Sequence, residues 1–145
     1  MKTYEIGEYY NAIKELQDAS RKEKDPALRM EIDHKIALSY WRIGDYKKAE
    51  PRFKNLITKK FSADSTLVLK YAHSLRFNGK YPEAIQNYKQ YLDSFPENKE
   101  AQNGIKSCEL TPIWEEKPTR FIVTQEKNLN SRFADYSPVY VGGLD

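Results

Sequence analysis

The feature that most constrains the fold is a six-residue motif that occurs three times. Gly44-Asp45-Tyr46-Lys47-Lys48-Ala49 and Gly79-Lys80-Tyr81-Pro82-Glu83-Ala84 both read Gly-x-Tyr-x-x-Ala, and they lie 35 positions apart. A third copy, Gly7-Glu8-Tyr9-Tyr10-Asn11-Ala12, lies 37 positions before the first of these. Self-similarity at a period of roughly 20 to 50 residues is typical of proteins that stack one small structural unit repeatedly. The sequence therefore predicts a repeat architecture.

The residues around each motif repeat as well, at helical spacing. A large apolar residue follows each alanine by four positions, and a second position three residues later completes the pattern. The first of these positions holds Leu16, Phe53 and Tyr88, and the second holds Ala19, Leu56 and Tyr91. Upstream of the motifs, Ile36, Ala37 and Tyr40 match Tyr71, Ala72 and Leu75. Steps of three and four place such residues on one face of a helix. Each unit is thus predicted to be two helices joined by a turn, where glycine permits the positive φ that ends the first helix.

The coarse prediction is an all-α chain whose helical pattern stops at Thr111. We expect helices over residues 8–22, 26–43, 46–58, 64–77, 81–94 and 97–110. Pro26 and Pro82 fall in first turns, where a missing N–H group costs little. The last helix is polar on most of its surface, as the final helix of a stacked array must be.

These residues resemble the tetratricopeptide repeat (TPR) family, whose unit is a helix-turn-helix of about 34 residues. The resemblance implies a TPR solenoid over residues 1–110, with about two and a half repeats and a capping helix, and a non-helical extension over 111–145. The match is partial for the first copy, whose leading helix is expected before Met1 or in a degenerate form. Asp33 and Val68 stand where the family usually has tryptophan.

The extension predicts the start of a following β-domain. Residues 121–124 (Phe-Ile-Val-Thr) and 138–141 (Pro-Val-Tyr-Val) are typical of short strands, and Gly142-Gly143 of a turn. The run Asn128-Leu129-Asn130-Ser131-Arg132-Phe133-Ala134-Asp135-Tyr136-Ser137-Pro138 is similar to the beginning of a β-propeller blade. Such runs follow TPR repeats in OmpA-family envelope proteins of the Bacteroidetes, which combine TPR repeats, a WD- or TolB-like propeller and an OmpA-like peptidoglycan-binding domain.

That second resemblance implies a cellular role. The chain would belong to a periplasmic, outer-membrane-associated protein linked to the type IX secretion system, with its export signal before Met1. Its partner would be a protein or peptide, namely a secretion-system or envelope component. Peptidoglycan would be bound only through a domain beyond Asp145. The chain carries 24 basic and 21 acidic residues, a balance too even to favour nucleic acid, and no apolar run approaches the roughly eighteen residues of a membrane span.

No residue pattern favours catalysis or a cofactor. The sequence contains no Gly-x-Ser-x-Gly, phosphate-binding loop, His-Glu-x-x-His or EF-hand loop. His34 and His73 could share a metal ion, but two imidazoles without a third ligand make a poor zinc site. Cys108 is the one cysteine, and it is more typical of a small buried residue than of a reactive thiol. We expect a non-enzymatic protein without cofactor or metal.

The TPR resemblance places partner binding in a groove lined by the first helix of each pair. The groove residues that it implies are His34, Leu38, Trp41, Arg42, Leu69, His73, Arg76, Phe77 and Asn103, beside Glu31, Thr66 and Ser107. An aromatic and basic groove suits an extended peptide with an acidic or apolar anchor, because Trp, Tyr and Arg are common hot-spot residues. Two alternatives stay open: Trp41 could pack between helices, and Arg42 and Arg76 could be ordinary solvated residues. Some TPR domains hold the terminal carboxylate of chaperone tails with a set of Lys and Asn residues. That set is absent here.

Two other functions remain open. The repeats could be a structural scaffold that packs on the following propeller, or the chain could be a generic soluble TPR adaptor with an ordinary linker. The extension also carries large apolar residues, Trp114, Phe121, Phe133 and Tyr136. If ordered, these must be buried, and we expect them to contact the final helices near Tyr91 and Ile105.

Overall fold

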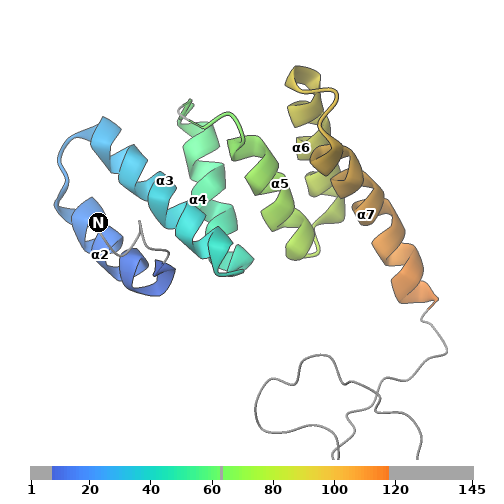
Figure 1. The fold of residues 1–145 in the computed structure, drawn as a ribbon, viewed down its shortest axis with the longest axis horizontal. Helices are drawn as coiled ribbons and strands as arrows, with labels where there is room; N and C mark the ends of the chain where they lie inside the picture. The colour runs from blue at the N-terminus through green and yellow to red at the C-terminus, as the bar shows by residue number, and fades with distance from the viewer. Residues whose placement is uncertain (1–7, 63, 118–145) are drawn as a thin grey trace, which may run out of the picture.

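The computed structural model describes residues 8–62 and 64–117, and this part of the chain is entirely helical (Figure 1). Its helices are α2 (Tyr9–Lys22), α3 (Pro26–Arg42), α4 (Tyr46–Thr58), α5 (Leu67–Phe77), α6 (Tyr81–Ser94) and α7 (Lys99–Glu116). No strand occurs in these two ranges. The predicted all-α class is therefore confirmed for the described residues.

Each helix packs against the next one in the chain. The helices follow one another across Figure 1 in chain order, from α2 to α7. α7 contacts α5 in addition to α6. The fold is thus built mainly from contacts between neighbours in the sequence, which short connections between helices favour.

The two Gly-x-Tyr motifs inside the described part form the same turn. Gly44 and Gly79 have φ angles of 77° and 76°, in the left-handed region that glycine reaches without steric cost. The Asp45 N–H donates to the Tyr40 carbonyl at 2.9 Å, and the Lys80 N–H donates to the Leu75 carbonyl at 2.9 Å. The repeated sequence therefore gives a repeated backbone geometry, as predicted.

The core follows the repeated apolar positions. Ala49 and Ala84 are fully buried, and so are Phe53 and Tyr88 one helical turn later. One cluster joins α2, α3 and α4 with Leu67, and a second joins α5, α6 and α7. Ala19 departs from the pattern, because it is exposed on α2.

Side-chain caps mark the starts of α3, α4 and α7. The Asp25 carboxylate accepts from the Ala27 N–H at 2.8 Å, so Pro26 lies in the first turn as predicted. The Asn98 side chain accepts from the Ala101 N–H at 2.9 Å at the start of α7. Such caps satisfy backbone donors that have no partner inside the helix.

Two predicted boundaries are wrong by three residues or more, and the others agree within two residues. α5 begins at Leu67, three residues later than expected, because Asp64 accepts from the Thr66 N–H at 2.8 Å and holds residues 64–66 in a turn. α7 does not stop at Leu110 but continues through Pro112 to Glu116. Proline removes one hydrogen bond there, and the helix closes beyond it with the Lys117 N–H donating to the Ile113 carbonyl at 3.1 Å.

The longer α7 carries Trp114, which the sequence pattern places in the non-helical extension and which is 62% exposed. The predicted strands over 121–124 and 138–141, the blade-like run over 128–138, the 142–143 turn and Gly7 lie outside the described residues. The expected burial of Trp114 is wrong, because it lies on the exposed surface near the end of α7, whereas the expected contacts of Phe121, Phe133 and Tyr136 with Tyr91 and Ile105 lie outside the described residues. Within the described ranges, no helix is both long and apolar enough to cross a membrane.

Candidate partner-binding surface

Aromatic side chains from three helices meet between α3 and α5. The Trp41 ring on α3 stacks on the His73 ring on α5, with centroids 6.3 Å apart and planes inclined by 18°. His73 also lies against Tyr88 of α6, with centroids 5.5 Å apart, and its Nε2 atom lies 3.6 Å from Glu100 Oε1 of α7. We call Trp41, His73 and Tyr88 the aromatic cluster. It joins helices that are distant in sequence.

Polar atoms in and beside the aromatic cluster lack hydrogen-bond partners. Trp41 Nε1, Arg76 Nε and the Tyr88 hydroxyl oxygen are buried and make no hydrogen bond within the described part of the chain. Leaving such a group unsatisfied costs about 1–3 kcal/mol. Indole and guanidinium nitrogens can only donate. Two of the three groups would therefore be satisfied by an acceptor oxygen.

The two arginines of the predicted groove both contact aromatic rings. Arg42 is exposed, and its guanidinium carbon lies 5.3 Å from the Trp41 ring centroid. The guanidinium carbon of Arg76 lies 4.6 Å from the Phe77 ring centroid. Phe77 itself stacks on Tyr46 at 4.2 Å between centroids, yet it remains 54% exposed. Arg76 is half-buried, so it is not an ordinary solvated side chain.

The other predicted groove residues lie elsewhere. Leu69 is buried in the second core cluster, and Leu38 packs partly against the first. Asn103 is exposed on α7 and makes no hydrogen bond to the described chain. Trp41 is half-buried, so it takes part in helix packing as well as in the surface. Ring contacts thus join Arg42, Trp41 and His73 in one set, and Arg76, Phe77 and Tyr46 in another. His73 and Arg76 lie one helical turn apart on α5, so the two sets are neighbours along that helix.

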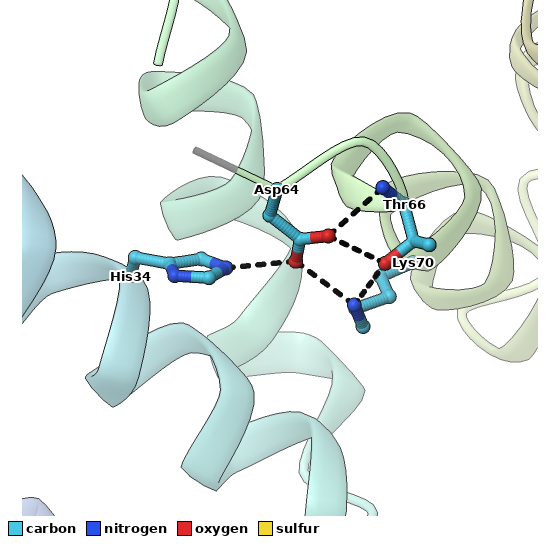
Figure 2. Close-up of polar contacts among 4 residues, drawn as sticks. All are labelled: His34, Asp64, Thr66 and Lys70. Carbon is cyan, nitrogen blue, oxygen red and sulfur yellow. Dashed lines mark hydrogen bonds and ion pairs between the residues drawn. The ribbon is translucent and has the colours of Figure 1, made fainter. Parts of the chain in front are cut away.

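His34 belongs to a separate polar cluster around Asp64 (Figure 2). His34 Nε2 donates to Asp64 Oδ2 at 2.9 Å, and Lys70 Nζ donates to the same oxygen at 2.9 Å. The Thr66 hydroxyl donates to Asp64 Oδ1 at 2.6 Å, and Lys70 Nζ also contacts that hydroxyl. The His34 ring lies 5.0 Å from the Phe61 ring. These contacts attach the segment before α5 to α3.

The cluster has a defined charge state. Burial alone would raise the pKa of Asp64, but the hydrogen bonds from Thr66 and Lys70 outweigh it and hold this pKa well below its usual range. Burial lowers the pKa of His34, and the bond to Asp64 only partly offsets that effect. At neutral pH the contact is therefore an ionised carboxylate accepting from a neutral imidazole.

Asp64 is not among the site residues predicted from the sequence, although a local signal for it exists. Asp64, Ser65 and Thr66 directly precede the apolar start of α5, and Asp followed two residues later by Thr is typical of a side-chain-closed turn before a helix. The pattern does not reveal that the second carboxylate oxygen faces α3.

Burial also sets the state of the other titratable groups near the aromatic cluster. It lowers the pKa of His73, with Glu100 opposing the shift in part. It raises the pKa of the Tyr88 hydroxyl and of the Cys108 thiol. The prediction that Cys108 is a small buried residue is confirmed. Over residues 8–62 and 64–117, no group of three or more His, Cys, Asp and Glu side chains could hold a metal ion.

Comparison with protein-family models, with curated proteins and with solved structures finds no match to this chain. The arguments about its function therefore rest on the residues and contacts described above.

Proposed function

We propose that this chain is a non-enzymatic protein-interaction module, built as a TPR-type solenoid, that binds an extended peptide of a partner protein. The repeated motif, the matching turns at Gly44 and Gly79 and the buried alanines Ala49 and Ala84 support the solenoid. The binding surface is formed by Trp41, Arg42, His73, Arg76 and Phe77, and we call it the partner surface. It needs no cofactor or metal.

The observation that carries this proposal is the pair of unsatisfied donors beside His73. Trp41 Nε1 and Arg76 Nε come from different helices, and both lack an acceptor within the described chain. An extended peptide presents carbonyl oxygens along its length, and an acidic side chain adds a carboxylate. Such a ligand would first meet the exposed Arg42 and Phe77 side chains, and the flanking aromatic rings would supply apolar contact. The two buried donors would gain acceptors once the side chains that cover them move aside.

The wider proposal follows the sequence resemblance. The partner would be a secretion-system or envelope component, and the chain would be part of a periplasmic, outer-membrane-associated OmpA-family protein similar to PorE of the type IX secretion system. It would contact neither nucleic acid nor the membrane interior. Peptidoglycan would be bound by a domain that this chain does not contain.

A second candidate function is a scaffold that holds a following domain. Leu110, Ile113 and Trp114 are large apolar residues exposed towards the C-terminal end of α7. Their spacing places them on one face of the helix, and this end of α7 extends beyond α6 in Figure 1. An exposed apolar row next to the chain's continuation would suit packing against the next domain.

A pull-down from envelope extract distinguishes the two functions. The bait is the full chain, compared with a Trp41→Phe, Arg76→Gln variant that keeps the ring stack but removes both unsatisfied donors. The control is Lys47→Ala, Lys89→Ala, two exposed lysines outside the partner surface. We expect the chain and the control to capture the same secretion or envelope protein, and the donor variant to capture about tenfold less. Equal capture by all three contradicts the proposed surface, and capture by none favours the scaffold.

A further inference from the structure

A second surface lies between α2, α3 and α4, where two adjoining hollows share Arg29 and Asp33. One hollow has a volume of about 440 Å³ and also includes Lys24 and Lys59 in its lining. The other has a volume of about 490 Å³ and includes Arg21 and Arg52. We call the two together the basic hollow. Neither the repeat pattern nor the proposed function accounts for it.

The lining of the basic hollow is strongly biased in charge. It contains five Lys or Arg side chains and one carboxylate, Asp33, whereas the whole chain carries 24 basic and 21 acidic residues. Arg21 pairs with Asp18, and Arg52 lies over the Tyr40 ring, whereas Lys24, Arg29 and Lys59 make no ion pair with the described residues. Unpaired cations gathered around a concavity produce a positive potential that attracts anions.

The neighbouring carboxylates are committed to other contacts. Asp33 accepts from the Ser20 hydroxyl at 2.8 Å. Glu23 accepts from the N–H groups of Lys24 and Asp25, at 2.8 Å and 2.9 Å. Asp25 caps α3 by accepting from the Ala27 N–H. These three carboxylates are therefore held by local donors and form no ion pair with the cations of the hollow, whereas Asp18 pairs with Arg21 on α2.

The basic hollow and the partner surface use opposite sides of α3. A helix turns by about 100° per residue, which places residues 29, 33 and 36 on one side and residues 34, 38 and 41 on the other. Arg29, Asp33 and Ile36 line the hollow, whereas Trp41 belongs to the partner surface. A ligand in one site would therefore leave the other accessible.

We infer that the basic hollow binds an acidic segment of a partner protein, at a site independent of the partner surface. Arginine pairs with a carboxylate through two parallel hydrogen bonds, and the hollow presents three arginines. Apolar atoms of Met30 and Ile36 in its walls can contact the aliphatic part of a glutamate side chain. Nucleic acid would need an extended positive surface along its phosphates, whereas Asp18, Glu23 and Asp25 interrupt this one.

Fluorescence anisotropy with a defined probe tests the inference. The probe is a fluorescein-labelled peptide of alternating glutamate and alanine, and its counterpart has glutamine in place of glutamate. The test variant is Arg29→Glu, Lys59→Glu, and the matched control is Lys47→Glu, Lys89→Glu, which changes net charge equally at exposed positions away from the hollow. We expect the wild-type chain to bind the glutamate peptide but not the glutamine peptide, and the test variant to raise Kd about tenfold or more. The control should change Kd much less.

Four results would overturn the inference. The wild-type chain could fail to bind the glutamate peptide, or the test and control variants could weaken binding equally. A DNA duplex that binds more tightly than the peptide would identify a nucleic-acid surface instead. Loss of peptide binding in Trp41→Phe, Arg76→Gln but not in Arg29→Glu, Lys59→Glu would place the acidic peptide on the partner surface. This last result would leave the proposed function intact.

Discussion

At the scale of single residues, the packing of Tyr88 against Gly104 leaves no room for a larger side chain at position 104. Tyr88 is completely buried on α6, and Gly104 is buried on α7 opposite its ring. A Cβ atom at position 104 would lie 2.4 Å from Tyr88 Cζ, closer than two carbon atoms approach without displacement. The aromatic ring thus occupies the space that any other residue at position 104 would need.

We therefore predict that Gly104→Ala destabilises the fold. The gain in helix propensity is smaller than the cost of moving a buried ring, so the free energy of unfolding should fall by about 1–3 kcal/mol. Urea denaturation followed by circular dichroism measures this change. The control is Asn103→Ala on the exposed side of α7, which should stay within about 0.5 kcal/mol of the wild type. A Gly104→Ala variant as stable as its control would show that α6 and α7 are less tightly packed than described.

At the scale of helices and turns, Asp64 links α5 to α3. Its two oxygens accept from Thr66 within the turn and from His34 and Lys70 across it (Figure 2). The folded pKa of Asp64 is lower than the ordinary aspartate value of 3.8. A carboxyl group whose pKa is lower in the folded than in the unfolded state stabilises the fold at pH values above its unfolded-state pKa. This contribution is lost as the pH falls through its folded-state pKa.

Replacing this carboxylate should destabilise the protein in a pH-dependent way. Asp64→Asn removes the ionised acceptor, so we expect a loss of about 2 kcal/mol at pH 7. The difference from the wild type should shrink as pH falls below 3.8, because Asp64 then binds a proton in the unfolded chain, and it should vanish only where the folded carboxyl group, whose pKa is much lower, is protonated too. Urea titrations at a series of pH values measure it, with Asp93→Asn at an exposed site of α6 as the control. A difference that does not change with pH would contradict the assigned charge state.

Local rules predicted most of the helices, and they failed where a side chain acts at longer range. The turns at Gly44 and Gly79 were predictable because glycine at the helix end determines the backbone there. The start of α5 was not, since Asp64 is also compatible with a first helical turn. The end of α7 was missed because Pro112 commonly ends a helix. Here only one hydrogen bond is lost, and the Thr111 hydroxyl donates to the Ser107 carbonyl at 2.7 Å just before it.

At the scale of the whole molecule, the partner surface was only partly predictable. The repeat places Trp41 and His73 on comparable helices, but their stacking depends on how closely α3 and α5 approach, which helical periodicity does not specify. The same limit explains Leu69, which lies in the core, and His34, whose partner Asp64 is 30 residues away in sequence. The basic hollow was missed because its cations come from α2, α3, α4 and the segments beside them, and they form no compact motif.

The most direct test of the central claim is site-specific photo-crosslinking in envelope extract. A photoreactive phenylalanine analogue replaces Phe77 on the partner surface or, as the matched control, Phe95, which is also exposed but stacks on Tyr91 at the end of α6. Both positions already hold a phenylalanine, so either replacement should preserve the fold. We predict a crosslink to a secretion or envelope protein from position 77 and none from position 95. Crosslinking from position 95 alone, from both positions equally, or from neither would contradict the assignment of the partner surface.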